Sequence, residues 1–111
     1  LFNFCLQSTA IIAKRSKNEK IAFGKLGEEI GLLFQLADDF LDLKGSLKKV
    51  GKPTKKDKKK GKSTLINLMG YKNAFIYAEK LKKKILLNLK KHGKNAEDLI
   101  DTVEFILQRN F

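Results

Sequence analysis

The chain has 111 residues, of which 42% are hydrophobic and 32% charged, a balance typical of one folded domain and unlike that of a disordered chain. No run approaches the roughly 18 apolar residues that a membrane helix needs, so we expect no membrane span. The formal charge of +12 raises the question of nucleic acid, but Arg15 and Arg109 are the only arginines. We therefore expect the lysines to coat solvated surface, with no nucleic-acid partner.

The single cysteine and the first residues of the chain indicate the cellular compartment of the protein. Cys5 has no partner for an internal disulfide, which fits a reducing compartment. Residues 1–6 lack the basic start and the cleavage site of a signal peptide. The sequence begins at Leu1, inside a helical pattern. We expect a cytoplasmic protein, and a chain that is a fragment of a longer one.

Helical patterns run through most of the chain and few runs favour strands, so we expect an all-α fold. Apolar residues at helical spacing predict the end of a buried helix over residues 1–14: Phe2, Cys5, Leu6, Ala10 and Ala13. Ser16 followed by Glu19 forms a capping box, in which the serine accepts from the start of the next helix and the glutamate reaches back.

The capping box opens a long helix that we expect to end near Lys44, where Gly45 supplies a stop. Its predicted apolar stripe comprises Ile21, Leu26, Ile30, Leu33, Phe34, Ala37 and Leu41. Residues 45–62 break every periodic pattern, because glycines and Pro53 punctuate a run of lysines, so we expect a basic loop there. A loop of this length inside a compact domain is more often functional than not.

Three shorter helices are predicted after the loop. Ser63 or Thr64 caps the first, which ends near Gly70, and the second covers about residues 72–91, before Gly93. The last helix is expected to be capped by Asn95. Inward-facing residues are predicted at Ala74, Ala78, Leu81, Ile85 and Leu89 in the second helix and at Leu99, Val103, Ile106 and Leu107 in the last.

The most informative stretch is residues 34–42, where three aspartates interrupt an apolar run. On a helix, Asp38 and Asp42 lie one turn apart on one face, Asp39 flanks them, and Gln35 precedes Asp38 on the same side. Like charges at this spacing repel. A magnesium ion explains the arrangement, because one or two carboxylates commonly hold it while substrate phosphates and waters complete its shell. The three aspartates alone leave open a second interpretation, a solvated acidic edge.

The expected loop offers positive charge near these aspartates. Lys52 follows Gly51 and Lys62 follows Gly61, and glycine lets the backbone approach a ligand closely. A diphosphate bound to magnesium needs cations on its far oxygens, which these two lysines would supply. The alternative is that they are two more lysines of a solvated basic run.

Residues 31–42, GLLFQLADDFLD, resemble the second aspartate-rich motif of trans-isoprenyl (polyprenyl) diphosphate synthases of the farnesyl or geranylgeranyl diphosphate type. The downstream GKP at 51–53 and GKST at 61–64 fall at the spacing of that family, and Leu-Met-Gly at 68–70 resembles its helix end. The resemblance covers about residues 1–91.

This resemblance implies that the chain is the C-terminal half of an isoprenoid-synthase-type helical bundle. It implies a prenyltransferase, with Mg²⁺ as its cofactor, that condenses an allylic diphosphate with isopentenyl diphosphate and is homodimeric at full length. No catalytic residue separate from the metal and diphosphate site is implied. The residues carried over are, for magnesium, Asp38, Asp39 and Asp42 and, for the allylic substrate, Gln35, Lys52 and Lys62.

The family's first aspartate-rich motif and its isopentenyl diphosphate site would lie upstream, so we expect these 111 residues alone to be inactive. Two departures from the family, Ser46 for a usual aspartate and Lys55 for a frequent glycine, affect the predicted loop rather than a ligand. Two other functions stay open. One is a family relative without chain elongation, and the other is a basic helical module that binds nucleic acid or an anionic membrane.

Overall fold

The computed structural model describes residues 1–50 and 64–108, without the side chains of residues 45–50 and 64, and this part of the chain consists of helices joined by short turns. The elements in chain order are α1 (Phe2–Ile12), α2 (Lys17–Val50), α4 (Thr64–Met69), α5 (Tyr71–Lys90), the 3-10 helix η1 (Gly93–Ala96) and α6 (Glu97–Gln108). These residues contain no strand, so the predicted all-α class is confirmed.

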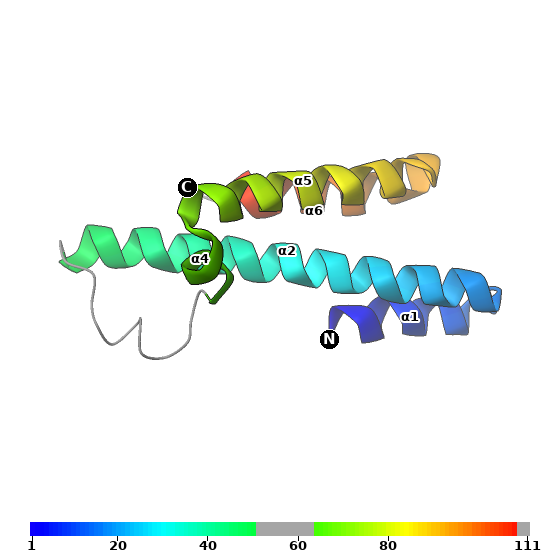
Figure 1. Cartoon of the computed structure of the whole chain (residues 1–111). Coiled ribbons are helices and arrows are strands. Elements are labelled where there is room, and N and C mark those ends of the chain that lie inside the picture. Colours follow the sequence, from blue (N-terminus) through cyan, green and yellow to red (C-terminus); the bar gives the residue numbers. More distant parts are fainter. Residues whose placement is uncertain (51–63, 109–111) are drawn as a thin grey trace.

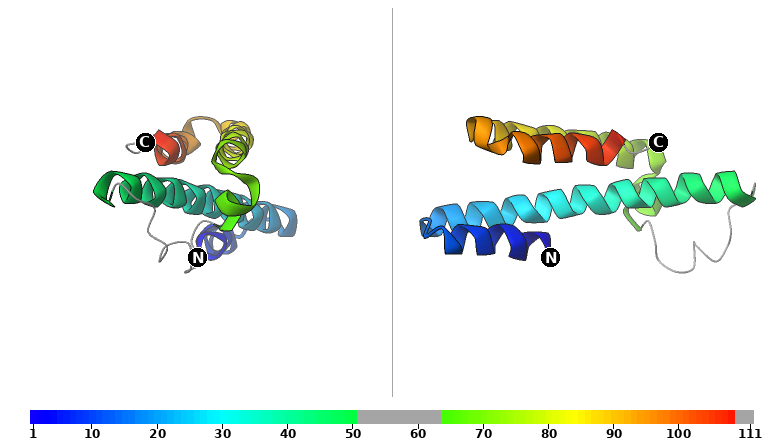
Figure 2. Two further views of the ribbon diagram at one scale, coloured as in Figure 1. Left: turned by 60° about the vertical axis from the view of Figure 1, so that its left-hand side comes forward. Right: turned by 180° about the vertical axis from the view of Figure 1, so that it is seen from behind.

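The long helix α2 lies at the centre of the molecule, and the other helices are arranged along it (Figure 1). α1 runs antiparallel along its N-terminal half on one side, while the antiparallel pair α5 and α6 packs on the other. The short α4 lies near the C-terminal half of α2 and leads into α5, as both further views show (Figure 2). None of the helices in the described ranges combines the length and the apolar character that a membrane crossing demands.

The end of α1 is closed by two backbone hydrogen bonds. The N–H of Lys14 donates to the carbonyl of Ile11, and the N–H of Arg15 donates to the carbonyl of Ala10, each at 3.0 Å. This is the Schellman arrangement, which requires a left-handed residue just after the helix. Lys14 occupies that position with a φ of 54°, although a side chain there is sterically unfavourable.

Lys14→Gly is therefore expected to raise the free energy of unfolding by about 0.5–1 kcal/mol, because glycine adopts the left-handed conformation without a Cβ clash. Urea denaturation followed by circular dichroism measures the change. The matched control is Lys25→Gly, at an exposed position inside α2. There glycine should destabilise by about 0.5–1 kcal/mol. Equal losses from the two substitutions would show that Lys14 is not strained.

The serine half of the capping box predicted at the start of α2 is confirmed, and Glu19 reaches back to the hydroxyl of Ser16. The Oγ of Ser16 accepts from the N–H of Glu19 at 3.2 Å and donates to the Glu19 carboxylate at 3.3 Å. Arg15 donates to the same carboxylate at 2.6 Å, and this bond lowers the pKa of Glu19 below its ordinary value. The turn thus directs α2 back along α1.

Glycines of α2 allow α1 to come close. A Cβ on Gly27 would overlap the carbonyl oxygen of Phe2, and would lie 2.8 Å from the Phe2 carbonyl carbon and 2.9 Å from the Cα of Asn3. A Cβ on Gly31 would lie 3.2 Å from the Phe2 ring, whereas one on Gly24 would meet only the side chain of Asn3, at 3.1 Å. The backbones of α1 and α2 therefore touch at Gly27.

α2 continues past the stop that the sequence predicted. We expected an end near Lys44 at Gly45, and the helix instead runs to Val50. A single glycine costs a helix only about 1 kcal/mol relative to alanine, and the leucine and lysines that follow are good helix formers. The first part of the predicted loop 45–62 is thus helical, while residues 51–63 lie outside the described part of the chain.

One hydrophobic core joins α2, α4, α5 and α6. The inward positions predicted in α5 and α6 are buried or pack against this core, as expected: Ala74, Ala78, Leu81, Ile85, Leu89, Leu99, Val103, Ile106 and Leu107. In α1, Ala10 is buried and Phe2 and Leu6 are half-buried, whereas Cys5 and Ala13 are exposed.

The stripe predicted in α2 was partly wrong. Leu26, Ile30, Leu33 and Ala37 are buried and Phe34 and Leu41 are half-buried, but Ile21 is 56% exposed because it precedes the stretch that α5 and α6 cover. The core instead takes in Leu36 and Phe40, on either side of the aspartates. The Phe40 ring packs edge-on against the rings of Tyr71 and Phe75, with centroids 5.2 and 5.6 Å away.

The junction between α5 and α6 also differs from the prediction. Gly93 takes a left-handed φ of 68° just after α5, as a helix-ending glycine should. Asn95, however, lies inside η1 and is not the cap of α6, because the 3-10 turn places Ala96 directly before that helix.

Candidate functional site

The predicted site occupies the C-terminal half of α2, next to the residues that bury this helix in the core. Its four polar side chains differ in exposure. Asp39 is buried at 8% exposure, Asp38 is half-buried, and Gln35 and Asp42 are exposed. The aspartates therefore lie at the boundary between the core and the surface, and only part of the motif faces solvent.

A hydrogen bond within α2 fixes the buried carboxylate. The Nε2 of Gln35 donates to Oδ1 of Asp39 at 3.1 Å, across one helical turn. A buried carboxylate without such donors is costly, so this bond stabilises Asp39 in its place. The sequence predicts Gln35 one turn before Asp38 on the same side of the helix, and the structure adds this hydrogen bond to Asp39, four residues on. Glutamine and aspartate at this spacing are known partners on a helix, a signal that was present in the sequence.

Asp38 and Asp42 form the part of the motif nearer solvent. They lie one turn apart on α2, so both carboxylates project from the same side of the helix. The described residues contain no cluster of three or more metal-binding side chains. Two carboxylates on one helix still fit magnesium, which keeps several waters and takes substrate phosphate oxygens to complete its shell. The donor set suits a metal that is shared with a phosphorylated ligand.

The surroundings of the motif are shaped by α1. Asn3 donates from Nδ2 to the carboxylate of Glu28 and to the carbonyl of Gly24, each at 3.0 Å. The ring of Phe2 packs against that of Phe34, with centroids 5.7 Å apart. Sequence reasoning missed these contacts, because no local pattern reveals which residues of a neighbouring helix will meet a given face. They hold α1 against α2 about one to four turns before the aspartates.

The two predicted lysines are not placed by the structure. Lys52 and Lys62 both lie outside the described residues, as do the glycines that precede them. The described chain resumes with α4 at Thr64, which confirms the short helix predicted there. Binding of a diphosphate by these lysines stays a prediction.

Comparison with known proteins points to one family. Residues 1–106 match the family described as Polyprenyl synthetase. A short chain isoprenyl diphosphate synthase from Methanocaldococcus jannaschii is 34% identical over 97 residues, covering 87% of this chain. A chloroplastic geranylfarnesyl diphosphate synthase from Leucosceptrum canum is 35% identical over 91% of the chain. A geranylgeranyl diphosphate synthase from Cyanophora paradoxa is 30% identical over 99%.

The chain corresponds to only part of each relative. The matched region is 29%, 28% and 37% of the length of these three proteins, in the order given. No solved structure matches the chain significantly. The family match nevertheless covers almost all of the chain, and the resemblance predicted from the aspartate motif is confirmed. The chain belongs to the polyprenyl synthetase family.

Proposed function

We propose that this chain is the C-terminal part of a trans-prenyltransferase, and that it holds magnesium and the diphosphate of an allylic substrate. The observation that carries the proposal is the pair of carboxylates one turn apart on α2, Asp38 half-buried and Asp42 exposed, beside a buried Asp39 that Gln35 anchors. The family match over residues 1–106 supports it. Because the named relatives include short-chain synthases, the product class proposed is a short-chain prenyl diphosphate.

In this proposal each residue has a separate role. Asp38 and Asp42 bind magnesium, with Asp39 completing the motif from its buried position. Lys52 and Lys62 bind the far oxygens of the diphosphate as point charges. When bound, magnesium supplies Lewis-acid stabilisation of the departing diphosphate. The half-buried side chains of Phe34 and Leu41 help to exclude water from the reacting carbon.

The overall reaction is head-to-tail prenyl transfer. The bond between the allylic carbon and its diphosphate oxygen breaks, the double bond of isopentenyl diphosphate attacks that carbon, and one proton leaves, with the released diphosphate as its acceptor. The contribution of the protein is electrostatic, through cations aimed at the charge that grows on the leaving group. The full-length protein, meaning this chain with the upstream half that we propose, acts in the cytoplasm as a homodimer.

The activity of the whole protein is tested by incorporation of radiolabelled isopentenyl diphosphate into prenyl products. The full-length protein should show magnesium-dependent turnover with an allylic diphosphate. The 111-residue chain alone should show none, because a reaction between two diphosphates needs charge compensation from both sides of the cleft. Turnover by the isolated chain would contradict the half-site proposal. An inactive, folded full-length protein would instead favour a non-catalytic relative.

A second test compares two lysines of one basic run. Lys52→Ala should weaken binding of the allylic diphosphate by about tenfold or more, the loss of one charge-assisted contact. Lys59→Ala removes the same charge from the same run and should change affinity by less than about threefold, as expected of a screened surface charge. Isothermal titration calorimetry at fixed magnesium measures both. Equal losses would mean that residues 51–63 act only through their summed charge.

A further inference from the structure

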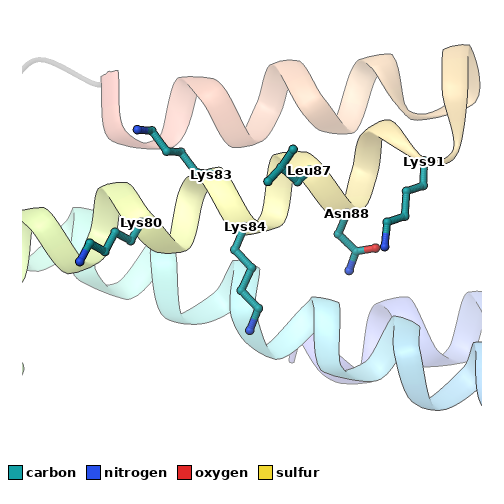
Figure 3. Close-up of a pocket in the computed structure, with 6 residues that line it drawn as sticks. All are labelled: Lys80, Lys83, Lys84, Leu87, Asn88 and Lys91. Carbon is teal, nitrogen blue, oxygen red and sulfur yellow. The ribbon is translucent and has the colours of Figure 1, made fainter.

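A second charged surface lies along α5, on a different helix from the aspartates of α2. Lysines line a hollow of about 530 Å³, together with Leu87 and Asn88 (Figure 3). The four lysines of this surface, which we call the α5 lysine face, are Lys80, Lys83, Lys84 and Lys91. They recur at helical spacing over three turns, at positions outside the buried stripe of α5, and Lys91 is the residue that directly follows the helix.

One lysine of the α5 lysine face forms an ion pair among the described residues. Lys84 points toward α2 and pairs with Glu29 at 3.2 Å, where the Glu29 side chain is only 14% exposed (Figure 3). This ion pair links α5 to α2, although the Oε2 atom of Glu29 accepts no hydrogen bond from the described residues. Among the described residues, no ion pair is formed by Lys80, Lys83 or Lys91. The acidic side chains of α5 and α6 are Glu79 on α5, which precedes Lys80, and Glu97, Asp98, Asp101 and Glu104 on α6.

Apolar side chains stand among these lysines. Leu87 lies in the lysine face and is 66% exposed, and Ile76 and Tyr77, on the same helix, are 44% and 39% exposed. None of the three belongs to the buried stripe of α5. Lysine stems that flank an exposed leucine allow the ammonium groups to reach outward while the apolar atoms meet a partner. A surface of this kind combines charge attraction with shallow apolar burial.

We propose that the α5 lysine face docks on an anionic lipid bilayer. Positive charge around exposed aliphatic and tyrosine side chains is the pattern that binds anionic headgroups and enters the interfacial region. Nucleic acid fits less well, because α5 contains no arginine and its exposed apolar atoms would gain nothing from a phosphate backbone. The proposal does not depend on the prenyltransferase function.

Vesicle co-sedimentation tests the proposal, with vesicles of phosphatidylglycerol and phosphatidylcholine compared with phosphatidylcholine alone. The chain should bind the anionic vesicles and not the neutral ones. The triple substitution K80Q/K83Q/K91Q should weaken binding on the order of 100-fold, at about fivefold for each lysine near an anionic surface. Lys84 is kept so that its pair with Glu29 survives. Leu87→Ser should weaken binding by roughly tenfold, through lost apolar burial.

The control K17Q/K25Q/K94Q removes the same charge from exposed positions outside α5 and should change affinity by less than about threefold. Circular dichroism verifies that each variant keeps its helical content. Equal losses in the two triple variants, or equal binding to neutral vesicles, would overturn the proposal. So would tight binding of duplex DNA that the α5 substitutions abolish while vesicle binding persists, since the face would then be a nucleic-acid surface.

Discussion

Asp38→Asn is expected to abolish magnesium-dependent binding of an allylic diphosphate by the full-length protein, with a loss of affinity of at least about 100-fold. Asp38 is half-buried at the boundary of the core, whereas Asp42 is exposed, so the charge of Asp38 is less screened by water. Asparagine keeps the size of the side chain and removes the charge that attracts the metal. Isothermal titration calorimetry with and without magnesium measures the loss.

The control for this substitution is Asp101→Asn, an exposed aspartate of α6 that changes the net charge equally. It should leave the affinity within about twofold, because exposed charges more than a Debye length of about 8 Å away are largely screened. Both variants should keep the helical content of the parent protein. If Asp38→Asn binds the diphosphate as tightly as Asp101→Asn does, then the assignment of the metal site to α2 is wrong.

Gly27→Ala is expected to lower the free energy of unfolding by about 1–3 kcal/mol, the range for overpacking a close contact. In an exposed helix the same change would stabilise by up to about 1 kcal/mol. Here the new Cβ would overlap the Phe2 carbonyl oxygen and clash with backbone atoms of α1. These atoms cannot move aside by a change of rotamer, as a side chain could. Urea denaturation gives the stability, and hydrogen exchange shows whether the amides of α1 lose protection.

Gly24→Ala serves as the matched control, one turn earlier in the same helix. Its Cβ would meet the end of the Asn3 side chain at 3.1 Å, which a small rotation relieves. We expect a change in stability within about 0.5 kcal/mol, with the gain in helix propensity offsetting a weakened Asn3 contact. Should Gly27→Ala prove as stable as Gly24→Ala, the backbones of α1 and α2 do not touch at Gly27.

Most helices followed from the sequence because their signals are local. The capping pair Ser16 and Glu19 opens α2, and the periodic apolar positions of α5, such as Ala74 and Ile85, are the ones that become buried. The end of α2 did not follow, since Gly45 supplies a weak local signal that good helix formers on both sides override. A glycine alone predicts the end of a helix less reliably than a hydrogen-bonding side chain predicts its start.

The candidate site was predictable in its residue types but not in its internal pairing. A helix brings Gln35 near both Asp38 and Asp39, and spacing alone does not rank the two. Asp39 is the buried carboxylate of the two, and a hydrogen bond from Gln35 offsets part of the cost of that burial. Burial depends on α4, α5 and α6, which lie far along the chain, and no motif within residues 31–42 records it.

Because α2 is one unbroken helix, a tilt at one point of it displaces residues further along the helix. Gly27 and Asp38 belong to the same helix, about 16 Å apart along its axis at about 1.5 Å per residue, and α1 fixes one end of that span. Long helices curve only gently, so a tilt of roughly 5° about Gly27 would swing the Asp38 backbone by about 1.4 Å. Displacements of about 1 Å are enough to cost a catalytic site on the order of 100-fold in rate. If the aspartates bind magnesium as proposed, the close contact at Gly27 helps to set the position of carboxylates three turns away.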